Sequence, residues 1–266
     1  MYINHIEDTI TKNFNKQIWT KFRRGVRDYK LIQLGDKILV CISGGKDSML
    51  LAQCIKRLQR NKEILFDAEY IVMNPGYNEE NLNKIRKNLN LLDIDAKFYD
   101  TRIFESTEKE KKNPCFLCAR LRRGWLYKKA EELGCNKIAL GHHFNDVIET
   151  ILMGMLYGSQ MQTMLPKLKA ENYCVEVIRP LYLVRENDII SWADFNKLEF
   201  INCACHVTER EGSSKRTEIK ALLNQLKKTN PTVEMNIFRS AENVNLKKLI
   251  SYHNGDEYHS FLDEFK

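Results

Sequence analysis

A six-residue run with two glycines joins an apolar stretch at 38–42 to a helical pattern that begins near Met49. The run is Ser43, Gly44, Gly45, Lys46, Asp47 and Ser48. Its glycines remove side chains that would keep the backbone away from a polyphosphate, and the following helix offers free N–H groups and the positive end of its dipole. The lysine adds a point charge, and the aspartate can hold a magnesium ion. This strand, loop and helix predict a phosphate-binding site.

The loop does not fit the Walker A pattern of common ATPases. Val40 stands where that pattern needs its first glycine, and Asp47 stands where a metal-binding hydroxyl should follow the lysine. The spacing Ser-Gly-Gly-x-Asp-Ser resembles instead the PP-loop of the ATP pyrophosphatases. As a family, these enzymes cleave ATP between its α and β phosphates and leave an adenylated intermediate.

Strand-like and helix-like segments alternate along most of the chain. Strands are expected at 37–42, 66–73, 96–99, 137–140 and 174–178, with helices that end near 60, 92, 133 and 157 and further helices at 186–196, 214–228 and 233–240. This alternation predicts an α/β fold with a doubly wound, right-handed parallel sheet. We expect a basic helical segment at 1–34, one domain at 35–250 with a loop-like stretch at 158–169, and a tail at 251–266 whose end frays.

Three turns follow the ends of predicted strands, at 43–48, 74–77 and 141–146. Ligands of parallel sheets bind beyond the carboxyl ends of the strands, so one nucleotide can touch all three turns. The predicted ATP-binding residues are Ser43, Gly44, Gly45, Lys46, Asp47, Ser48, Met73, Asn74, Gly141 and His143. Of these, Lys46 and Asp47 are the predicted catalytic residues.

Two side chains in the third turn have competing interpretations. His143 can contact phosphate or stabilise the leaving pyrophosphate, or it can be a histidine satisfied at the end of a strand. Asp146 stands where a helix begins, so it can cap that helix or join Asp47 in binding magnesium near the phosphates. The sequence leaves both choices open.

The net charge of +7 is compatible with a nucleic-acid partner without requiring one. Basic residues concentrate around Arg23 and Arg24 and around Arg122 and Arg123, where contact with nucleic acid competes with a solvated helix face as the explanation. No stretch approaches about 18 uncharged apolar residues, and the amino terminus is charged where a signal peptide needs an apolar run. We therefore expect a cytoplasmic protein without a membrane partner.

Four of the eight cysteines form two close pairs, which buried packing does not explain. They are Cys115 with Cys118 and Cys203 with Cys205. Disulfides are not expected, because the cytosol keeps thiols reduced. The pairs can bind zinc, hold an iron–sulfur cluster or perform thiol chemistry, and their spacing alone does not choose among these.

Several motifs together resemble the tRNA 2-thiocytidine synthetase family, over roughly residues 18–250. They are the loop at 43–48, Val-Met-Asn-Pro-Gly-Tyr at 72–77, Pro-Cys-x-x-Cys-Ala-Arg-Leu-Arg-Arg-Gly at 114–124, Ala-Leu-Gly-His-His at 139–143, Ile-Arg-Pro-Leu at 178–181 and the later cysteines. The resemblance implies a fold of the adenine nucleotide alpha hydrolase type. Where the family shows two adjacent aspartates, this chain has Asn145 before Asp146.

The family resemblance also implies a [4Fe-4S] cluster held by three cysteines, with the fourth iron open. Carried over, Cys115 and Cys118 are two ligands, and the third is Cys203, with Cys205 as the alternative. Replacing a carbonyl oxygen with sulfur needs a donor that is neither protonated nor lost to water, and iron can hold sulfide in that state beside the activated base. The implied cofactors are ATP, Mg²⁺ and the cluster.

The implied activity is ATP-dependent thiolation of a tRNA pyrimidine, by resemblance cytidine-32 of the anticodon loop. The expected partners are tRNA, a sulfur donor (a cysteine desulfurase or sulfide) and a second copy in a homodimer. The tRNA-binding candidates are Arg23, Arg24, Arg122 and Arg123. Two alternatives remain: a lysidine synthetase-like ligase, which needs no cluster, and a nucleotide-binding iron–sulfur or zinc protein that senses redox state.

Overall fold

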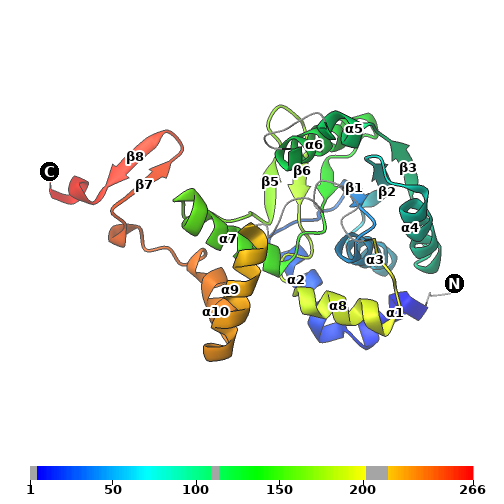
Figure 1. The fold of residues 1–266 in the computed structure, drawn as a ribbon, viewed down its shortest axis with the longest axis horizontal. Coiled ribbons are helices and arrows are strands. Elements are labelled where there is room, and N and C mark those ends of the chain that lie inside the picture. Colours follow the sequence, from blue (N-terminus) through cyan, green and yellow to red (C-terminus); the bar gives the residue numbers. More distant parts are fainter. Residues whose placement is uncertain (1–4, 109–113, 202–214, 266) are drawn as a thin grey trace. The chain divides into compact units, whose positions relative to one another are not determined.

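The computed structural model describes residues 5–108, 114–201 and 215–265 (Figure 1). The chain divides into two compact units. The first unit comprises residues 1–147 and 165–214, and the second comprises residues 148–164 and 215–266. All ten predicted ATP-binding residues belong to the first unit.

Among the described residues, six strands form one sheet in the first unit, in the order β3-β2-β1-β4-β6-β5. The strands are β1 (Lys37–Ile42), β2 (Asp67–Asn74), β3 (Lys97–Asp100), β4 (Lys137–Ala139), β5 (Lys167–Lys169) and β6 (Glu176–Ile178). β1 pairs in parallel with β2 on one side and with β4 on the other. The strand order therefore changes direction between β1 and β4, where such sheets bind their ligands.

Helices cover both faces of this sheet (Figure 1). On one face, α3 (Lys46–Asn61), α4 (Glu79–Leu91) and α8 (Glu186–Phe195) share a hydrophobic core with β1 and β2. On the other face, α6 (Pro114–Glu132) packs with Leu39 and Ile71, and α5 (Ile103–Glu108) lies beside α6. The predicted doubly wound α/β architecture is confirmed.

The amino-terminal segment is helical, as predicted, and joins the α3 side of the core. It consists of α1 (His5–Lys12), a π-helix (Asn15–Trp19) and α2 (Thr20–Asp28). One apolar face of this segment is buried, with exposed fractions of 5% or less for Ile18, Trp19, Phe22 and Val26. Glu7 of α1 is also fully buried, and its carboxylate lies 3.3 Å from Arg57 and 2.5 Å from Arg60 of α3.

Two short elements of the first unit differ from the sequence-based expectation. Residues 158–169 were expected to be a loop, but Lys167–Lys169 forms β5, which runs antiparallel to β6 rather than parallel. Its Lys-Leu-Lys sequence carries too little apolar pattern to indicate a strand, while lysines are common on the edge of a sheet because they hinder pairing with other chains. The helix α5 likewise lies in a stretch where no helix was expected.

The second unit contains the later part of α7 (Phe144–Gly158), with α9 (Lys215–Thr229) and α10 (Val233–Ser240). Glu149 of α7 is 2% exposed and lies 3.2 Å from Arg216 and 3.7 Å from Lys220 of α9. A buried carboxylate between two cations fixes how these helices pack within the unit.

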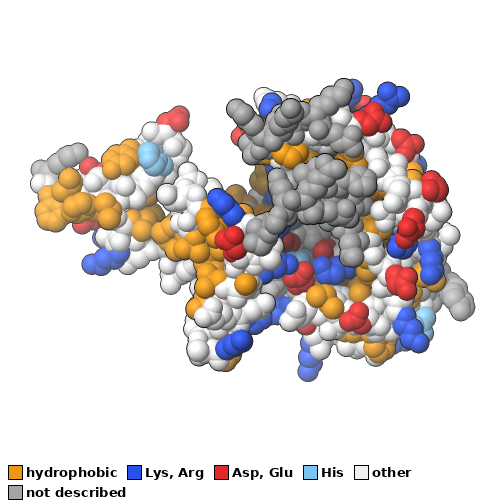
Figure 2. All heavy atoms as spheres, in the orientation of Figure 1, with side chains coloured by type: hydrophobic (Ala, Val, Ile, Leu, Met, Phe, Trp, Pro, Cys, Tyr) orange, Lys and Arg blue, Asp and Glu red, His pale blue; other side chains and the backbone are white. Residues whose placement is uncertain are grey.

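A hairpin follows these helices in the chain, formed by β7 (Ser251–Asn254) and β8 (Glu257–Ser260). It is flanked by 3₁₀ turns at Leu246–Lys248 and Phe261–Phe265. The expectation of a fraying end is therefore wrong for these residues. Apolar side chains gather on the surface of this segment (Figure 2), among them Ile250 at 81% and Phe265 at 79% exposed. Within the described residues, no helix is both long and apolar enough to cross a membrane.

Candidate nucleotide-binding site

The predicted phosphate-binding loop lies between the end of β1 and the start of α3. Gly44 has a φ of +87°, which favours glycine, and a Cβ there would lie 2.7 Å from the Ile85 side chain and 2.8 Å from that of Ile201. Gly45 is the N-cap of α3 in an extended conformation. The first N–H groups of α3 have no partner within a helix, so they are available to a phosphate at this position.

Hydrogen bonds from Ser48 close this loop on itself. The Ser48 hydroxyl donates to the carbonyl of Gly45 at 2.9 Å, accepts from the Ser43 N–H at 3.1 Å and lies 3.2 Å from the Ser43 hydroxyl. The Tyr77 hydroxyl donates to the Ser43 carbonyl at 3.2 Å. Ser48 is only 5% exposed. In this arrangement its side chain holds the loop rather than facing a ligand.

The turn after β2 lies beside the loop, because β1 and β2 are neighbours in the sheet. Asn74 is 8% exposed, and its amide oxygen accepts hydrogen bonds from the N–H groups of Gly76 at 3.0 Å and Tyr77 at 2.7 Å. Its amide nitrogen donates to Asp100 at 2.9 Å. Met73 is 5% exposed at the end of the same strand. Asn74 therefore shapes the turn that carries Tyr77 to the loop.

The turn after β4 approaches the loop from the other side. A Cβ on Gly141 would lie 3.0 Å from the backbone carbon of Asp47 and 3.0 Å from the backbone nitrogen of Ser48. Such a distance is too short for a side-chain carbon against a backbone that is fixed by a helix. Glycine at this position allows β4 to end directly against the first turn of α3.

Four charged or titratable side chains meet at the carboxyl ends of β1 and β4, a place that we call the crevice. They are Lys46, Asp47, His143 and Glu186. The Lys46 ammonium donates to Glu186 at 3.1 Å and to Asp47 at 3.3 Å. The Nε2 atom of His143 lies 3.7 Å from Asp47 and 4.0 Å from Glu186. His143 is 3% exposed. The structure thus brings together the predicted Lys46, Asp47 and His143 at the carboxyl ends of β1 and β4.

Burial and neighbouring charges shift the pKa values of Asp47 and Lys46 in opposite directions. Burial raises the pKa of Asp47, although His143 and Lys46 partly oppose this effect. Burial alone would lower the pKa of Lys46, but the carboxylates of Asp47 and Glu186 outweigh it and raise the pKa. Lys46 is therefore cationic at neutral pH. One carboxylate oxygen of Asp47, Oδ1, is buried and has no hydrogen-bond partner among the described residues.

The structure favours the capping interpretation of Asp146. Its carboxylate accepts a hydrogen bond from the His143 N–H at 3.0 Å, and its own N–H donates to Nδ1 of His143 at 3.4 Å. This reciprocal pair satisfies N–H groups at the start of α7. Asn145 caps a different helix, since its side-chain oxygen accepts from the Glu186 N–H at 3.0 Å. No group of three His, Cys, Asp or Glu side chains among the described residues is arranged to hold a metal ion.

Glu186 is the site residue that the sequence analysis did not identify. Its place in the sequence indicates only the start of a helix. In the structure, its carboxylate contacts the ammonium group of Lys46, which lies 140 positions earlier in the chain. An acidic residue in the first turn of a helix is common, because it interacts favourably with the helix dipole, so its sequence position gave no separate signal.

The predicted cluster ligands are described only in part. Cys115 and Cys118 lie one turn apart in α6, and the Cys118 side chain is half-buried. Cys203 and Cys205 lie outside the described residues. Arg122 follows Cys118 by four positions on α6 and comes close enough to Cys41 of β1 to oppose the rise that burial causes in the pKa of that thiol. Arg123, the next residue, is exposed.

The two amino-terminal arginines differ in their contacts. Arg23 of α2 donates to Glu63 at 2.7 Å, with both side chains about half exposed. Arg24 is exposed, and no ion pair is recorded for it within the described residues. The lysine preceding this pair on α2, Lys21, bonds to Asp188 in the first turn of α8 at 2.9 Å.

The fold and the loop together define a PP-loop nucleotide-binding protein. The PP-loop domain family matches residues 11–227 of the chain. A tRNA-cytidine(32) 2-sulfurtransferase of Alcanivorax borkumensis is 36% identical over 243 residues, which are 89% of this chain and 84% of that protein. Its counterpart in Vibrio cholerae is 37% identical over 87% of this chain and 76% of its own. The chain therefore belongs to the tRNA 2-thiocytidine synthetase family of ATP-dependent tRNA thiolases.

A solved structure has the same fold. The U34-tRNA thiolase NcsA from Methanococcus maripaludis, determined with its [4Fe-4S] cluster, superimposes with a TM-score of 0.67. The match covers 84% of this chain and 77% of that one, with 24% sequence identity.

Proposed function

We propose that this tRNA sulfurtransferase uses ATP to adenylate a pyrimidine oxygen, that of cytidine-32 in tRNA, and replaces this oxygen with sulfur. The observation that carries the proposal is the meeting of the PP-loop with Lys46, Asp47 and His143 at the point where the strand order reverses. The named relatives act on cytidine-32, and the site supplies what the first half of that reaction needs. This half is a transfer at the α-phosphate of ATP.

Binding of the phosphates falls to the first turn of α3 and to Lys46. The N–H groups of that turn point at the crevice, and the helix dipole favours negative charge there. A phosphate oxygen takes the place that Glu186 holds beside the ammonium group, 3.1 Å away. The ammonium then neutralises charge that develops on the leaving pyrophosphate.

Magnesium fits the donor set of this site. The free Oδ1 atom of Asp47 is buried and faces His143 at 3.7 Å, so a cation would supply the partner that it lacks. Hard carboxylate oxygens combined with phosphate oxygens are typical of magnesium sites in nucleotide enzymes. We propose Asp47 as the protein ligand of the magnesium ion. Asp146 can be a second ligand only when its carboxylate releases the hydrogen bond from the His143 N–H.

The two ring nitrogens of His143 face different groups. Its Nδ1 lies 3.4 Å from both the backbone nitrogen and the carboxylate of Asp146, within the cap of α7. Its Nε2 faces the carboxylates of Asp47 and Glu186 at 3.7 and 4.0 Å. We propose that it donates to an oxygen of the leaving pyrophosphate when the phosphates enter the crevice.

The proposed chemistry balances in two steps. The cytidine oxygen forms a bond to the α-phosphorus, and the bond from that phosphorus to the bridging oxygen of the β-phosphate breaks, so pyrophosphate leaves. In the second step a carbon–sulfur bond forms at the same base carbon while its bond to oxygen breaks. AMP then carries the original oxygen away. The base must be accessible for both steps, which suits a nucleotide of a tRNA loop.

The proposed ligands of the [4Fe-4S] cluster are Cys115, Cys118 and either Cys203 or Cys205. Bound there, a cluster with an open iron would supply sulfur in a form protected from water. The [4Fe-4S] cluster of the thiolase from Methanococcus maripaludis supports the assignment of a cluster to this chain.

The remaining assignments are also proposals. Residues 1–34 would serve as a basic segment, 35–250 as the catalytic part and 251–266 as a tail. We propose tRNA contacts at Arg23, Arg24, Arg122 and Arg123, a cysteine desulfurase or sulfide as the sulfur donor, and a homodimer as the working form in the cytoplasm.

The proposal is tested with protein purified without oxygen. We expect iron and an iron–sulfur absorption band, formation of AMP and pyrophosphate that depends on tRNA, and a thiolated cytidine in nucleosides digested from the tRNA. A colourless protein holding only zinc would refute the cluster assignment. Nucleotide cleavage without thiolation, or attachment of lysine to the base, would refute the sulfurtransferase assignment.

A further inference from the structure

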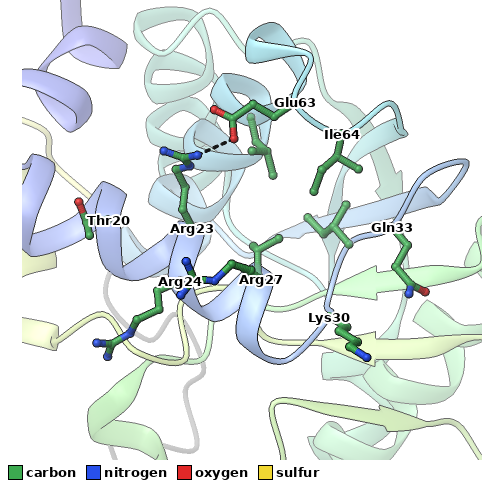
Figure 3. Close-up of a pocket in the computed structure, with 11 residues that line it drawn as sticks. Thr20, Arg23, Arg24, Arg27, Lys30, Gln33, Glu63 and Ile64 are labelled. Carbon is green, nitrogen blue, oxygen red and sulfur yellow. Dashed lines mark hydrogen bonds and ion pairs between the residues drawn. The ribbon is translucent and has the colours of Figure 1, made fainter.

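A second basic feature lies in the first unit, along α2 and the turn that follows it (Figure 3). A cavity of about 480 Å³ there has a floor of apolar side chains that includes Val26, Ile32 and Leu58. Arg24, Arg27 and Lys30 line it on the side of α2. This cavity lies next to the start of β1, whereas the PP-loop follows the end of β1, so the two are separate features.

The charges of this cavity are unbalanced. Arg23 is paired with Glu63, and Arg27 is paired with its neighbour Asp28 at 2.8 Å. No ion pair involving Arg24 or Lys30 is recorded in the part of the chain that the structure describes. Arg27 keeps 77% of its side chain exposed despite its ion pair. Another anion can therefore readily replace Asp28 as its partner.

The cations do not converge on one point. Figure 3 shows the Arg23 guanidinium turned to Glu63, while the side chains of Arg24 and Lys30 reach away from that ion pair and from each other. Six positions separate these two residues, and α2 ends between them at Asp28. Divergent cations suit several phosphates in a row better than the single phosphate of a free mononucleotide.

Ion pairs connect this surface to the catalytic crevice. Lys21 in the first turn of α2 bonds to Asp188 in the first turn of α8, two residues after the Glu186 that contacts Lys46. The helix α2 has nine residues, and the cavity is lined from its first residue, Thr20, to Lys30, so it begins beside Lys21 and runs along the helix. A nucleic acid with one nucleotide in the crevice can follow α2 to this cavity.

We propose that Arg24, Arg27 and Lys30 form a binding track for the ribose–phosphate backbone of tRNA, outside the modified loop nucleotide. The inference rests on the proposed function and refines it. Of the two arginines predicted in this segment, Arg24 contacts the backbone, while Arg23 supports the wall of the cavity through Glu63. The apolar floor accepts the ribose of one nucleotide.

The test compares two triple variants that lose the same charge. One is Arg24→Gln/Arg27→Gln/Lys30→Gln on α2 and the turn after it. The control is Lys84→Gln/Arg86→Gln/Lys87→Gln on α4, a helix that contributes no residue to the lining of the cavity, with side chains that are exposed or form surface ion pairs. Binding of unmodified tRNA is measured over a range of salt concentrations. Unchanged circular dichroism and ATP affinity verify that each variant is folded, and Arg24→Gln alone serves if the triple variant is not.

We expect the α2 variant to bind tRNA at least about tenfold more weakly, with the slope of log affinity against log salt reduced by about two to three. The α4 variant should lose less than about threefold, as expected for a general change in net charge. Equal losses in the two variants, or an unchanged salt slope, would overturn the proposal. So would saturable binding of free cytidine monophosphate at the cavity with tRNA affinity unaffected. Failure of the wild-type protein to bind tRNA would refute the proposed function itself.

Discussion

Removal of the Lys46 charge should weaken ATP binding by more than the loss of one contact. In Lys46→Met, the phosphates lose a charge-assisted hydrogen bond worth about 1.5–3 kcal/mol. The change also leaves Glu186 and Asp47, formerly 3.1 and 3.3 Å from the ammonium, uncompensated beside an incoming polyanion. We expect a total loss of about 2–4 kcal/mol, or roughly 30- to 1,000-fold in the dissociation constant of Mg-ATP.

The second part of this loss can be isolated with a double-mutant cycle. Glu186→Gln removes one of the two stranded carboxylates while keeping the shape of the side chain. In the Lys46→Met background it should recover about 1 kcal/mol, or roughly fivefold in affinity, because repulsion of the phosphates falls. In the wild-type background the same substitution leaves Lys46 with Asp47 as its carboxylate partner and should change affinity less.

The assay is calorimetric titration of Mg-ATP into each of the four proteins. A matched control exists at the other end of α3, where Lys56 lies 2.7 Å from Asp93. The cycle of Lys56→Met and Asp93→Asn should leave ATP affinity unchanged, because that pair is remote from the PP-loop. The reasoning is refuted if Lys46→Met costs less than about fivefold, or if its cost is the same with and without the Glu186 carboxylate.

Three further predictions concern the fold around the site. Gly141→Ala should weaken ATP binding about tenfold in titrations, because its Cβ would press on the backbone of α3. Gly124→Ala is the control: with open space around its Cβ, it should leave ATP binding intact and raise the melting temperature. Glu7→Ala should lower the free energy of unfolding in urea by about 2–3 kcal/mol, because it removes the buried carboxylate between Arg57 and Arg60 and leaves them only longer contacts with Asp8 and Asp93. Asp8→Ala should lower it by under about 1 kcal/mol. Burial raises the pKa of Asp47 above 3.8, so ionisation of this carboxyl costs stability as pH rises through the raised pKa. Asp47→Asn should therefore be more stable than wild type near pH 7. The gap between their free energies of unfolding, measured in urea, should close toward pH 3.8. No change in that gap with pH would contradict the burial argument.

Local pattern was enough to predict the core of the site. The strand at 37–42 matches β1 at both ends, because a continuous apolar run is followed by a serine, two glycines and the start of a helix. The rule that ligands bind beyond the carboxyl ends of parallel strands then grouped the three turns, and the observed strand order places the turns after β1, β2 and β4 side by side. These parts of the fold depend on short stretches whose residues all favour one structure.

Parts that depend on distant partners were not predictable. β5 has three residues, two of them lysines, and exists because β6 offers it a free edge. Glu186 reaches the site because Asn145 caps the helix that carries it, a contact across 41 positions. Neither feature leaves a periodic signal, since neither is determined by its own neighbours in sequence.

The contacts also divide the predicted site residues by role. Ser48 and Asn74 already use their side-chain atoms to hold the loop and its neighbouring turn, and Asp146 uses its carboxylate to cap α7. We therefore propose that phosphate recognition comes from backbone N–H groups and from Lys46, and that Asp47 binds the metal. On this reasoning Ser48 matters through the geometry of the backbone that it fixes. A cysteine or alanine there would impair ATP binding by loosening the loop, and the loss should be accompanied by lower thermal stability, which loss of a direct ligand contact would not produce.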